Sequence, residues 1–359
     1  MNKKHTLALC LLAFGIQAQA DNIQYKTLDE QALRACIFIE DRQLRLRCFD
    51  DATGRSAVVK QDEAPAAAAP LDGGLLLYKQ TEDTTLSWLD SRWELAPAAK
   101  RGTFSIRPYQ PVYLLPVYHN SSPNTRPSSP NPANTVTNPE NLDSNELKFQ
   151  LSLKTKVMEN IFGDNGDLWF AYTQSSRWQV MNEELSRPFR ETNYEPELIF
   201  TWRTSWSAFR EATGWEPRLL GLSLNHQSNG RALPLSRSWN RVIGMVGFER
   251  ENTMFQFRPW MRIDEKPADD DNPDITDFVG RGDWLLVHKV DGHELSLLTR
   301  HNFKGGRDSR GAVQFDWAFP LTSNLRGHLQ YFTGYGESLI DYNYKSDYLG
   351  LGLSLVGWY

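Results

Sequence analysis

Apolar and polar residues alternate through most of the sequence from residue 102 onward. Between residues 147 and 157, leucine, phenylalanine and valine dominate the odd positions, and lysine, glutamine and serine fill the even ones. Residues 254–263 and 348–359 alternate in the same way. The odd positions hold phenylalanine, proline, methionine and isoleucine in the first segment, and four leucines and Tyr359 in the second. Successive side chains of a β-strand point to opposite faces, so this period predicts long strands that each have one apolar face.

The polar face of these predicted strands carries lysine and arginine repeatedly. This arrangement is typical of a transmembrane β-barrel, whose apolar face contacts lipid and whose polar face lines the interior. A soluble all-β protein is the alternative, although its strands are usually shorter. The pattern therefore predicts an all-β fold, a 12-stranded antiparallel transmembrane β-barrel.

About twelve segments carry the pattern. They are residues 102–118, 145–158, 166–181, 194–208, 217–228, 238–250, 252–264, 278–290, 292–303, 311–320, 323–334 and 346–359. An even number of strands places both ends of the barrel on the periplasmic side. Residues 119–146, which are rich in proline, asparagine and serine, are expected to form a long external loop.

The first 20 residues have the layout of a secretory signal peptide, with two lysines, an apolar run and Ala18-Gln19-Ala20 at the end. The apolar run is too short to cross a bilayer as a helix. We expect residues 21–57 to form a small helical periplasmic extension, whose start is marked by Thr27 and Glu30 at capping-box spacing. Residues 58–101 are expected to be a linker and lead-in to a barrel domain at 102–359.

Two cysteines, Cys36 and Cys48, remain after the signal peptide, and export favours a disulfide between them. One unbroken helix would separate them by about 18 Å, whereas a disulfide needs Cα atoms within about 7 Å. Either the chain turns near residues 41–43 and the disulfide closes, or the thiols are free. The turn with its disulfide is the favoured interpretation.

Composition narrows the possible partners. A net charge of −5 gives no reason to expect a nucleic-acid partner. Eighteen phenylalanines, thirteen tyrosines and twelve tryptophans suit the aromatic girdles of a barrel, although a soluble β-protein could also use them.

The hairpin formed by residues 217–228 and 238–250 carries the candidate chemistry. Leucines at positions 220, 222 and 224 place the even positions on the outer face, and His226 and Ser228 continue that face. A hairpin centred near residue 233 brings Asn240 opposite His226 and Ser238 opposite Ser228. The three polar side chains are therefore expected together on the outer, lipid-facing wall.

These residue types suit nucleophilic catalysis. His226 can activate Ser228, and the amide oxygen of Asn240 can hold the other imidazole nitrogen. Because asparagine carries no charge, a second electrostatic group is needed, either a backbone N–H near Gly230 or a bound cation. Hydroxyl and carbonyl oxygens around Arg231 and Ser236 are the hard ligands that calcium takes. An ordinary polar turn is the alternative, since His-x-Ser is a weak motif.

Seven segments of the sequence match a known family. They are FQLSLK, YTQSSRWQ, SRPFRETNYEPEL, NHQSNGR, SRSWNR, DDNPDIT and GYGESLIDYN. With them the chain resembles outer membrane phospholipase A, a family of calcium-dependent twelve-stranded barrel enzymes of Gram-negative bacteria. The resemblance implies hydrolysis of phospholipid and lysophospholipid acyl esters in the outer membrane by a calcium-bound homodimer. A non-enzymatic barrel, either a channel or a scaffold, is the alternative.

The resemblance also implies roles for individual residues. Ser228 matches the nucleophile, His226 the base and Asn240 the third catalytic member. The calcium ligands at the dimer interface match Ser186 from one subunit and, from the other, the Arg231 carbonyl and Ser236.

Two further positions carry implied roles, and one departs from the family. Asp271 matches an acidic ligand of a calcium site in the monomer, and Gln174 matches a polar residue of the dimer contact. Leu233 stands where a second acid is expected beside Asp271, which puts calcium binding by the monomer in doubt.

Overall fold

The structure is a computed structural model that describes residues 33, 35–39, 41–52, 86–322 and 325–358. The chain divides into two units, residues 1–76 and residues 77–359, and each is described by itself. The expected signal peptide, the Thr27–Glu30 capping box and residues 58–85 of the expected linker and lead-in lie outside the described residues.

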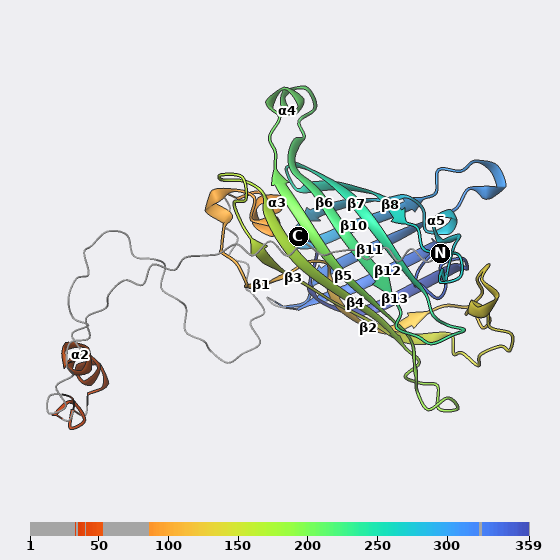
Figure 1. The fold of residues 1–359 in the computed structure, drawn as a ribbon, viewed down its shortest axis with the longest axis horizontal. Coiled ribbons are helices and arrows are strands. Elements are labelled where there is room, and N and C mark those ends of the chain that lie inside the picture. Colours follow the sequence, from red (N-terminus) through yellow and green to blue (C-terminus); the bar gives the residue numbers. More distant parts are fainter. Residues whose placement is uncertain (1–32, 34, 40, 53–85, 323–324, 359) are drawn as a thin grey trace, which may run out of the picture. The chain divides into compact units, whose positions relative to one another are not determined.

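The second unit is a closed antiparallel β-barrel of twelve strands, β2 to β13 (Figure 1). Each strand pairs with the next along the chain, and β13 pairs back with β2 to close the barrel. The strands are β2 Val112–His119, β3 Asn145–Met158, β4 Asp167–Trp178, β5 Phe189–Arg203, β6 Glu216–Ser228, β7 Ser238–Arg250, β8 Thr253–Ile263, β9 Gly282–Val290, β10 His293–His301, β11 Gly311–Pro320, β12 Arg326–Tyr335 and β13 Lys345–Val356. The predicted fold and strand number are confirmed.

Three predicted strand starts are wrong by four residues or more, and the strand predicted at 194–208 also ends early, at Arg203. The segment 102–118 is broken into a short β1, Ile106–Pro108, which pairs only with β3, and the barrel strand β2. Strand β9 begins at Gly282 because a short helix, α5 (Ile275–Phe278), precedes it. Strand β5 begins at Phe189, five residues before the predicted start, because its first inward side chains are buried ionic groups such as Arg190, which is 2.6 Å from Glu146. Such polar inward positions hide the alternation that marks a strand.

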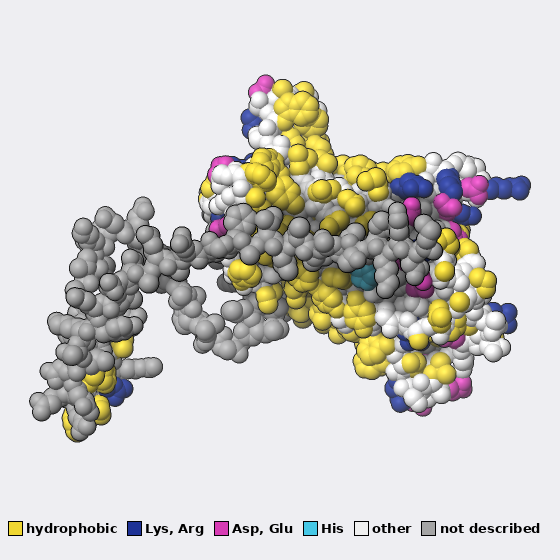
Figure 2. All heavy atoms as spheres, in the orientation of Figure 1, with side chains coloured by type: hydrophobic (Ala, Val, Ile, Leu, Met, Phe, Trp, Pro, Cys, Tyr) yellow, Lys and Arg dark blue, Asp and Glu magenta, His cyan; other side chains and the backbone are white. Residues whose placement is uncertain are grey.

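The faces of the strands follow the predicted parity. In β3, Leu151 and Leu153 are 52% and 37% exposed, whereas Lys154 and Lys156 are 0% and 1% exposed. In β13, the leucines at 349, 351, 353 and 355 are all exposed. Figure 2 shows hydrophobic side chains over much of the visible wall of the barrel, with charged side chains mostly near its two ends. Hydrophobic side chains thus face outward and polar side chains fill the interior, as a bilayer requires.

A short helix closes one end of the barrel interior. Helix α3 (Trp88–Trp93) begins at Ser87, whose side chain accepts a hydrogen bond from the Asp90 N–H at 3.1 Å. It is followed by a 3-10 turn, η1 (Pro97–Ala99). The buried Leu89 and Trp93 pack with inward-facing side chains of the barrel. The sequence predicts only a linker and lead-in at 58–101, whereas residues 88–93 pack against the inner wall of the barrel.

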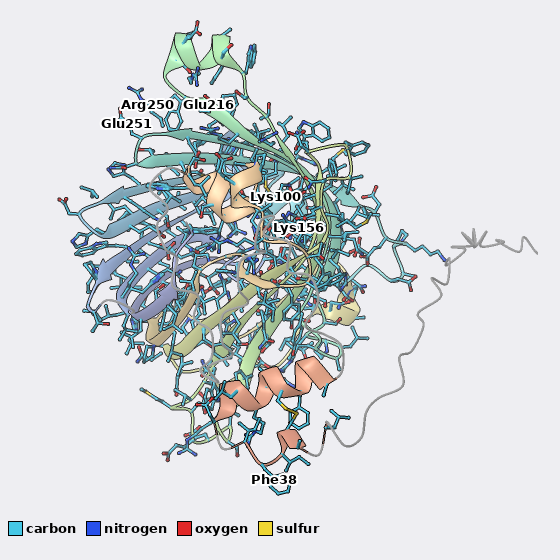
Figure 3. All side chains as sticks on the ribbon, turned by 90° about the vertical axis from the view of Figure 1, so that its left-hand side faces the viewer. Phe38, Lys100, Lys156, Glu216, Arg250 and Glu251 are labelled. Atoms are coloured by element: carbon cyan, nitrogen blue, oxygen red, sulfur yellow. A yellow bond between two sulfur atoms is a disulfide. The ribbon has the colours of Figure 1, made fainter. Side chains whose placement is uncertain are left out.

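Ionic contacts anchor this closing segment. The carboxylate of Glu94 lies 2.7 Å from Arg107 and 2.9 Å from Lys156. Lys156 also contacts Asp167 at 3.0 Å, and Lys100 contacts the same carboxylate at 2.6 Å. Both lysines are labelled in Figure 3, close to α3. The closing segment is therefore held by charges on the barrel wall as well as by apolar packing.

The remaining helical elements lie in the connections between strands. Helix α4 (Ser207–Thr213) lies between β5 and β6, and the 3-10 turns η2 (Pro132–Asn134) and η3 (Gly306–Asp308) lie in the β2–β3 and β10–β11 connections. Within the described residues, no helix combines the length and apolar character needed to span a bilayer.

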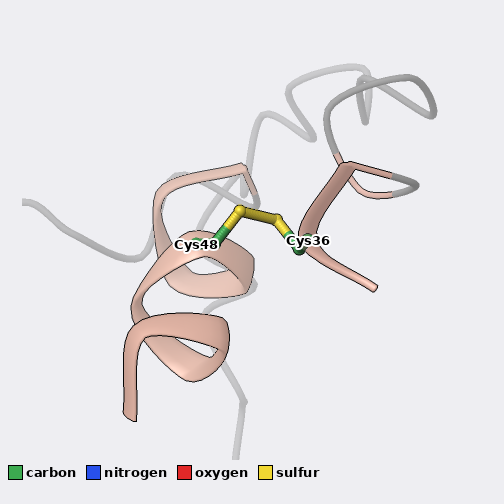
Figure 4. The surroundings of a disulfide bond; sticks show 2 residues. All are labelled: Cys36 and Cys48. Atoms are coloured by element: carbon green, nitrogen blue, oxygen red, sulfur yellow. A yellow bond between two sulfur atoms is a disulfide. The ribbon is translucent and has the colours of Figure 1, made fainter. Parts of the chain in front are cut away.

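The first unit contains helix α2 (Arg42–Ala52) and the disulfide Cys36–Cys48, with Cα atoms 5.5 Å apart (Figure 4). The chain turns before α2, and Asp41 Oδ1 accepts the Leu44 N–H at 2.9 Å, which caps the helix. The predicted turn and disulfide are confirmed. Phe38, labelled in Figure 3, is 85% exposed in this unit.

Candidate functional site

The β6–β7 hairpin has the predicted register. His226 pairs with Asn240, and Ser228 pairs with Ser238. His226 is exposed, and Ser228 and Asn240 are half-buried, on the face that carries the exposed leucines 220, 222 and 224. The three candidate catalytic side chains therefore lie on the outer wall, where the apolar row of β6 ends.

His226 and Asn240 form a hydrogen bond of 2.8 Å between Nδ1 and Oδ1. An amide oxygen only accepts, so Nδ1 carries the proton and the lone pair lies on Nε2. Ser228 lies two residues along the same strand, about 6.7 Å away along the backbone and on the same face. The described hydrogen bonds do not join Ser228 to His226, but this spacing lets Oγ and Nε2 meet when the side chains rotate.

Asn229 holds the loop that follows Ser228, a role that sequence analysis missed. It is buried, and its Oδ1 accepts hydrogen bonds from the N–H groups of Arg231 (3.2 Å) and Arg237 (3.0 Å). Its Nδ2 donates to the Leu235 carbonyl at 2.8 Å. The backbone that carries Arg231 and Ser236 is thereby fixed beside Ser228. The available signal was the asparagine of the Ser228-Asn229-Gly230 sequence, although this sequence is also common in ordinary turns.

Two of the candidate calcium ligands are brought together. Ser236 Oγ donates to Asp271 Oδ2 at 2.6 Å, and Asn134 Nδ2 donates both to Asp271 Oδ1 and to the Ser236 carbonyl at 2.9 Å. Ser186 lies in a different loop, between β4 and β5, where it is exposed and has a φ of +59°. The described hydrogen bonds do not join Ser186 to Ser236, although Arg231, in the same loop as Ser236, donates to the carbonyl of Phe189, three residues after Ser186, at 3.3 Å. Leu233 is 61% exposed.

Gln174 lies in the same outer row as Ser228. In register, Gln174 pairs with Tyr194 on β5, and Tyr194 pairs with Ser228 on β6. Adjacent strands are about 4.8 Å apart, so Gln174 and Ser228 are separated by about 10 Å across the sheet. A contact with a second molecule at Gln174 would therefore lie next to the candidate nucleophile.

Gly230 approaches the ring of Tyr194. Its φ is +60°, and a Cβ atom built on it would lie 3.0 Å from Tyr194 Cε2. A left-handed backbone with a ring this close favours glycine. This geometry keeps the backbone near Ser228 free of a side chain.

A carboxylate also contacts the site, and sequence analysis missed it. Asn240 Nδ2 donates to Glu265 Oε1 at 3.0 Å. Burial raises the pKa of Glu265, the nearby Asp270 raises it further, and Arg262 opposes the shift. The available signal was parity, because Glu265 follows Met261 and Ile263 on the outer face and Ile263 pairs with Asn240.

Comparisons with known proteins agree with this geometry. A family model described as phospholipase A1 matches residues 89–355. The chain is 40% identical over 257 residues to a putative phospholipase A1 of Neisseria meningitidis, a match that covers 70% of this chain and 66% of that protein. It is 36% identical over 252 residues to phospholipase A1 of Escherichia coli, covering 70% of this chain and 82% of that protein.

Solved structures show the same barrel. Outer membrane phospholipase A from Escherichia coli superimposes with a TM-score of 0.62 at 33% identity, covering 71% of this chain and 95% of that one. The outer membrane phospholipase of Salmonella typhi, described as a dimer with bound calcium, gives a TM-score of 0.63 at 35% identity, covering 72% and 95%. This chain belongs to the phospholipase A1 family.

Proposed function

We propose that this protein hydrolyses acyl esters of phospholipids and lysophospholipids in the outer membrane, as a calcium-dependent phospholipase A1/A2 that is active as a homodimer. The observation that carries the proposal is the His226–Asn240 pair, 2.8 Å apart beside Ser228 on the outer wall of the barrel. Lipids reach such a site by diffusing along the wall, so the substrate does not have to leave the bilayer.

The reaction follows from the positions of three side chains. Asn240 holds the Nδ1–H of His226, and the free Nε2 takes the proton of Ser228 as its Oγ attacks the ester carbonyl carbon. The imidazolium then gives this proton to the departing glycerol oxygen, which releases a lysophospholipid and leaves the acyl group on Ser228. A water molecule deprotonated by His226 then cleaves the acyl-serine, which releases the fatty acid and restores the hydroxyl.

The oxyanion of each tetrahedral intermediate needs donors or positive charge. The backbone N–H of Gly230 is our candidate donor, since it lies two residues after Ser228 in a loop fixed by Asn229. The oxygens of the Ser236 hydroxyl and the Arg231 carbonyl fit a calcium ion, because the Ser236 proton points to Asp271 and leaves the hydroxyl lone pairs available. Calcium bound there would supply positive charge near the oxyanion.

A second copy of the chain completes this ligand set. Ser186 is exposed on the β4–β5 loop, where it is open to a second copy, and the described hydrogen bonds do not join it to Ser236. Ser186 of a second copy is therefore the proposed remaining ligand, with Gln174 in the contact between copies. The Salmonella typhi relative, a dimer with bound calcium, supports this arrangement. Asp271 is a candidate calcium ligand for the monomer, although both of its oxygens already accept hydrogen bonds.

The barrel interior argues against the alternative of a channel. Lys148 and Arg177 both contact Glu337, at 2.8 Å and 2.7 Å, across the interior. At the other end, Arg92 of α3 donates to the Gly357 carbonyl at 3.2 Å. Charged contacts and the closing segment therefore occupy the space that an open pore would need.

The hydrogen bond between Arg92 and Gly357 also indicates how the barrel is oriented in the membrane. Helix α3 and the C-terminal segment share one end of the barrel, where the β7–β8 and β9–β10 turns are also short. Short turns lie on the periplasmic side of outer-membrane barrels. We therefore place the end of the barrel that holds α3 in the periplasm and the end that holds Ser228 at the cell surface.

The test uses the whole protein refolded in detergent with dioleoylphosphatidylcholine, in calcium or in chelator. Ser228→Ala should lower fatty-acid release by at least about a thousandfold, since the nucleophile is lost. The matched control is Ser238→Ala, which changes the serine directly opposite on the same face and should retain activity. Full hydrolysis by Ser228→Ala would refute the mechanism, and full hydrolysis in chelator would refute the role of calcium.

A further inference from the structure

Asn240 binds a carboxylate on the side opposite to His226. Its Oδ1 accepts from His226 Nδ1 at 2.8 Å, and its Nδ2 donates to Glu265 Oε1 at 3.0 Å. We propose that Glu265 is a positioning residue of the active site, which fixes the Asn240 amide and, through it, the tautomer of His226. The inference rests on the proposed function and adds Glu265 as a fourth residue to the candidate site of Ser228, His226 and Asn240.

The β8 strand explains why a carboxylate reaches this place. Ile263, the last residue of β8, pairs with Asn240, and its outer-face neighbour Met261 is 69% exposed. Glu265 is the next position of this outer row, half-buried just beyond the end of the strand. A carboxylate at the edge of an apolar wall is unfavourable unless a donor satisfies it, and Asn240 supplies that donor.

The charges around Glu265 leave it available to Asn240. The neighbouring cation, Arg262, contacts Asp270 at 2.6 Å and donates to the carbonyls of Asn272 and Pro273. Asp270 and Asp271 also face Glu265 and raise its pKa after burial does. Within the described part of the chain, Glu265 forms no ion pair, so its hydrogen bond from Asn240 is not in competition with a salt bridge.

An ionised carboxylate accepts hydrogen bonds and donates none. Glu265 therefore requires that Asn240 present Nδ2 to it, which turns Oδ1 toward His226. Oδ1 in turn requires the proton on Nδ1, and the Nε2 lone pair is left for Ser228. A reversed amide would place Nδ2 against His226 and select the tautomer with the proton on Nε2, which cannot deprotonate Ser228.

Glu265 also provides the charge that the asparagine lacks. A negative group behind the amide stabilises the imidazolium that forms when Ser228 attacks, as the aspartate of a serine-protease triad does. The carboxylate acts through Asn240 and touches neither the substrate nor the reacting atoms.

A second histidine–asparagine pair in the barrel provides a comparison, because no described hydrogen bond joins its asparagine to a carboxylate. His119 Nδ1 and Asn145 Oδ1 are 2.9 Å apart, and these residues are also cross-strand partners, on β2 and β3. Among the described hydrogen bonds, no carboxylate is joined to Asn145. His119 therefore serves as an internal reference for the effect of Glu265 on His226.

The first experiment compares Glu265→Gln with the wild-type protein in detergent. Glutamine offers a donor as well as an acceptor, so the Asn240 amide is no longer forced into one orientation. The 15N chemical shifts of labelled histidine should show neutral His226 as the Nδ1–H tautomer in the wild-type protein and as a mixture in the variant, with His119 unchanged. The kcat for dioleoylphosphatidylcholine should fall about tenfold with little change in KM. Asp264→Asn removes an exposed charge next to Glu265 and should change neither result.

The second experiment exchanges the charge. Asn240→Asp puts a carboxylate against His226 but also against Glu265, and two facing carboxylates cannot both ionise easily. The double variant Asn240→Asp/Glu265→Gln removes this conflict and should be about tenfold more active than Asn240→Asp. A purely structural role for Glu265 predicts no such rescue.

The possible results separate the inference from the proposed function. A wild-type tautomer and kcat in Glu265→Gln, with no rescue in the double variant, would overturn the role of Glu265 while Ser228→Ala still tests the hydrolase. Activity retained by Ser228→Ala would overturn the proposed function. The histidine shifts would still report whether Glu265 controls His226, because they do not depend on turnover.

Discussion

Ser236 Oγ donates its proton to Asp271 Oδ2 across 2.6 Å. The other oxygen of Asp271 accepts from Asn134, so the carboxylate is held from both sides. The hydroxyl proton is thereby directed to Asp271, and the lone pairs of Ser236 are left for a cation. Asp271 thus orients Ser236, a candidate calcium ligand. Leu233, in the same β6–β7 loop as Ser236, supplies no second acid.

Asp271→Asn should weaken the response to calcium and leave the catalytic side chains in place. An asparagine must turn its NH2 group toward either Asn134 or Ser236. Toward Asn134 it faces another donor and that contact is lost; toward Ser236 the hydroxyl must accept, so its proton is no longer held by residue 271. We expect half-maximal activity to need about tenfold more calcium, the size of effect typical of groups that orient metal ligands. A calcium titration of fatty-acid release measures the change.

The matched control for this substitution is Asp269→Asn. Asp269 lies in the same acidic loop, is exposed and has no side-chain hydrogen bond among those described. Asp269→Asn removes the same charge. Equal shifts of the calcium concentration for half-maximal activity in both variants would show that only the overall negative charge of the loop matters. An unchanged calcium response in Asp271→Asn would contradict the orienting role.

Gly230→Ala should lower kcat while the barrel stays folded. The φ of +60° disfavours alanine by about 1 kcal/mol, and its Cβ would lie 3.0 Å from Tyr194 Cε2. Relief of this contact moves the backbone N–H proposed for the oxyanion, so we expect a loss of about ten- to a hundredfold. Gly163→Ala is the control, since its φ is +77° and no atom lies within 4 Å of the added Cβ. Similar activities in the two variants would argue against an oxyanion role for Gly230.

The face and register of the hairpin that carries the candidate catalytic residues were predictable because two simple rules determine them. A period of two assigns His226 and Ser228 to the same face as the leucines before them, and the hairpin centre then pairs His226 with Asn240. Parity also assigns Glu265 to the outer face, after Met261 and Ile263. Its contact with Asn240 was not predictable, however, because Glu265 lies in the loop after β8 and alternation does not determine the path of a loop.

The closing helix α3 escaped prediction for a different reason. It is only six residues long, Trp88–Trp93, which is too short for a helical period to be recognised. Its buried residues pack against side chains on the inner wall of the barrel, among them Trp169 and Ile199. The interior of a membrane barrel is expected to be polar. The apolar residues on the inner faces of β4 and β5 therefore did not indicate that a helix packs against them.

Glu94→Gln should loosen this closing segment. The carboxylate is 1% exposed and contacts Arg107 at 2.7 Å and Lys156 at 2.9 Å. Loss of one partner of a buried ion pair destabilises by about 3 kcal/mol, because the remaining charges are left unpaired. We expect a lower thermal unfolding midpoint and faster trypsin cleavage after Lys100 or Arg101. Glu183→Gln is the control, since its pair with Arg187 is exposed and should contribute about 0.5 kcal/mol or less. Equal stability of the two variants would show that apolar packing alone holds α3.

The outer row that joins Gln174, Tyr194 and Ser228 predicts where two copies meet. Gln174→Cys offers a direct test, because Cys36 and Cys48 are already bonded to each other and do not compete. The control is Leu297→Cys, which is 38% exposed on β10, halfway around the barrel from β4. Non-specific collisions between barrels should crosslink Gln174→Cys and Leu297→Cys to the same extent.

With calcium and a non-hydrolysable phospholipid analogue present, Gln174→Cys should form disulfide dimers under mild oxidation, and Leu297→Cys should not. The reason is geometric: the calcium ligands Ser236 and Ser186 belong to different copies in the proposed site, so metal binding holds β4 of one copy near β4 of the other. Chelator should abolish the crosslink, and an electrophoretic dimer band measures it. Equal dimer formation in chelator would show that the two copies associate without calcium. Activity in a sample shown to be monomeric would show that hydrolysis does not require a second copy.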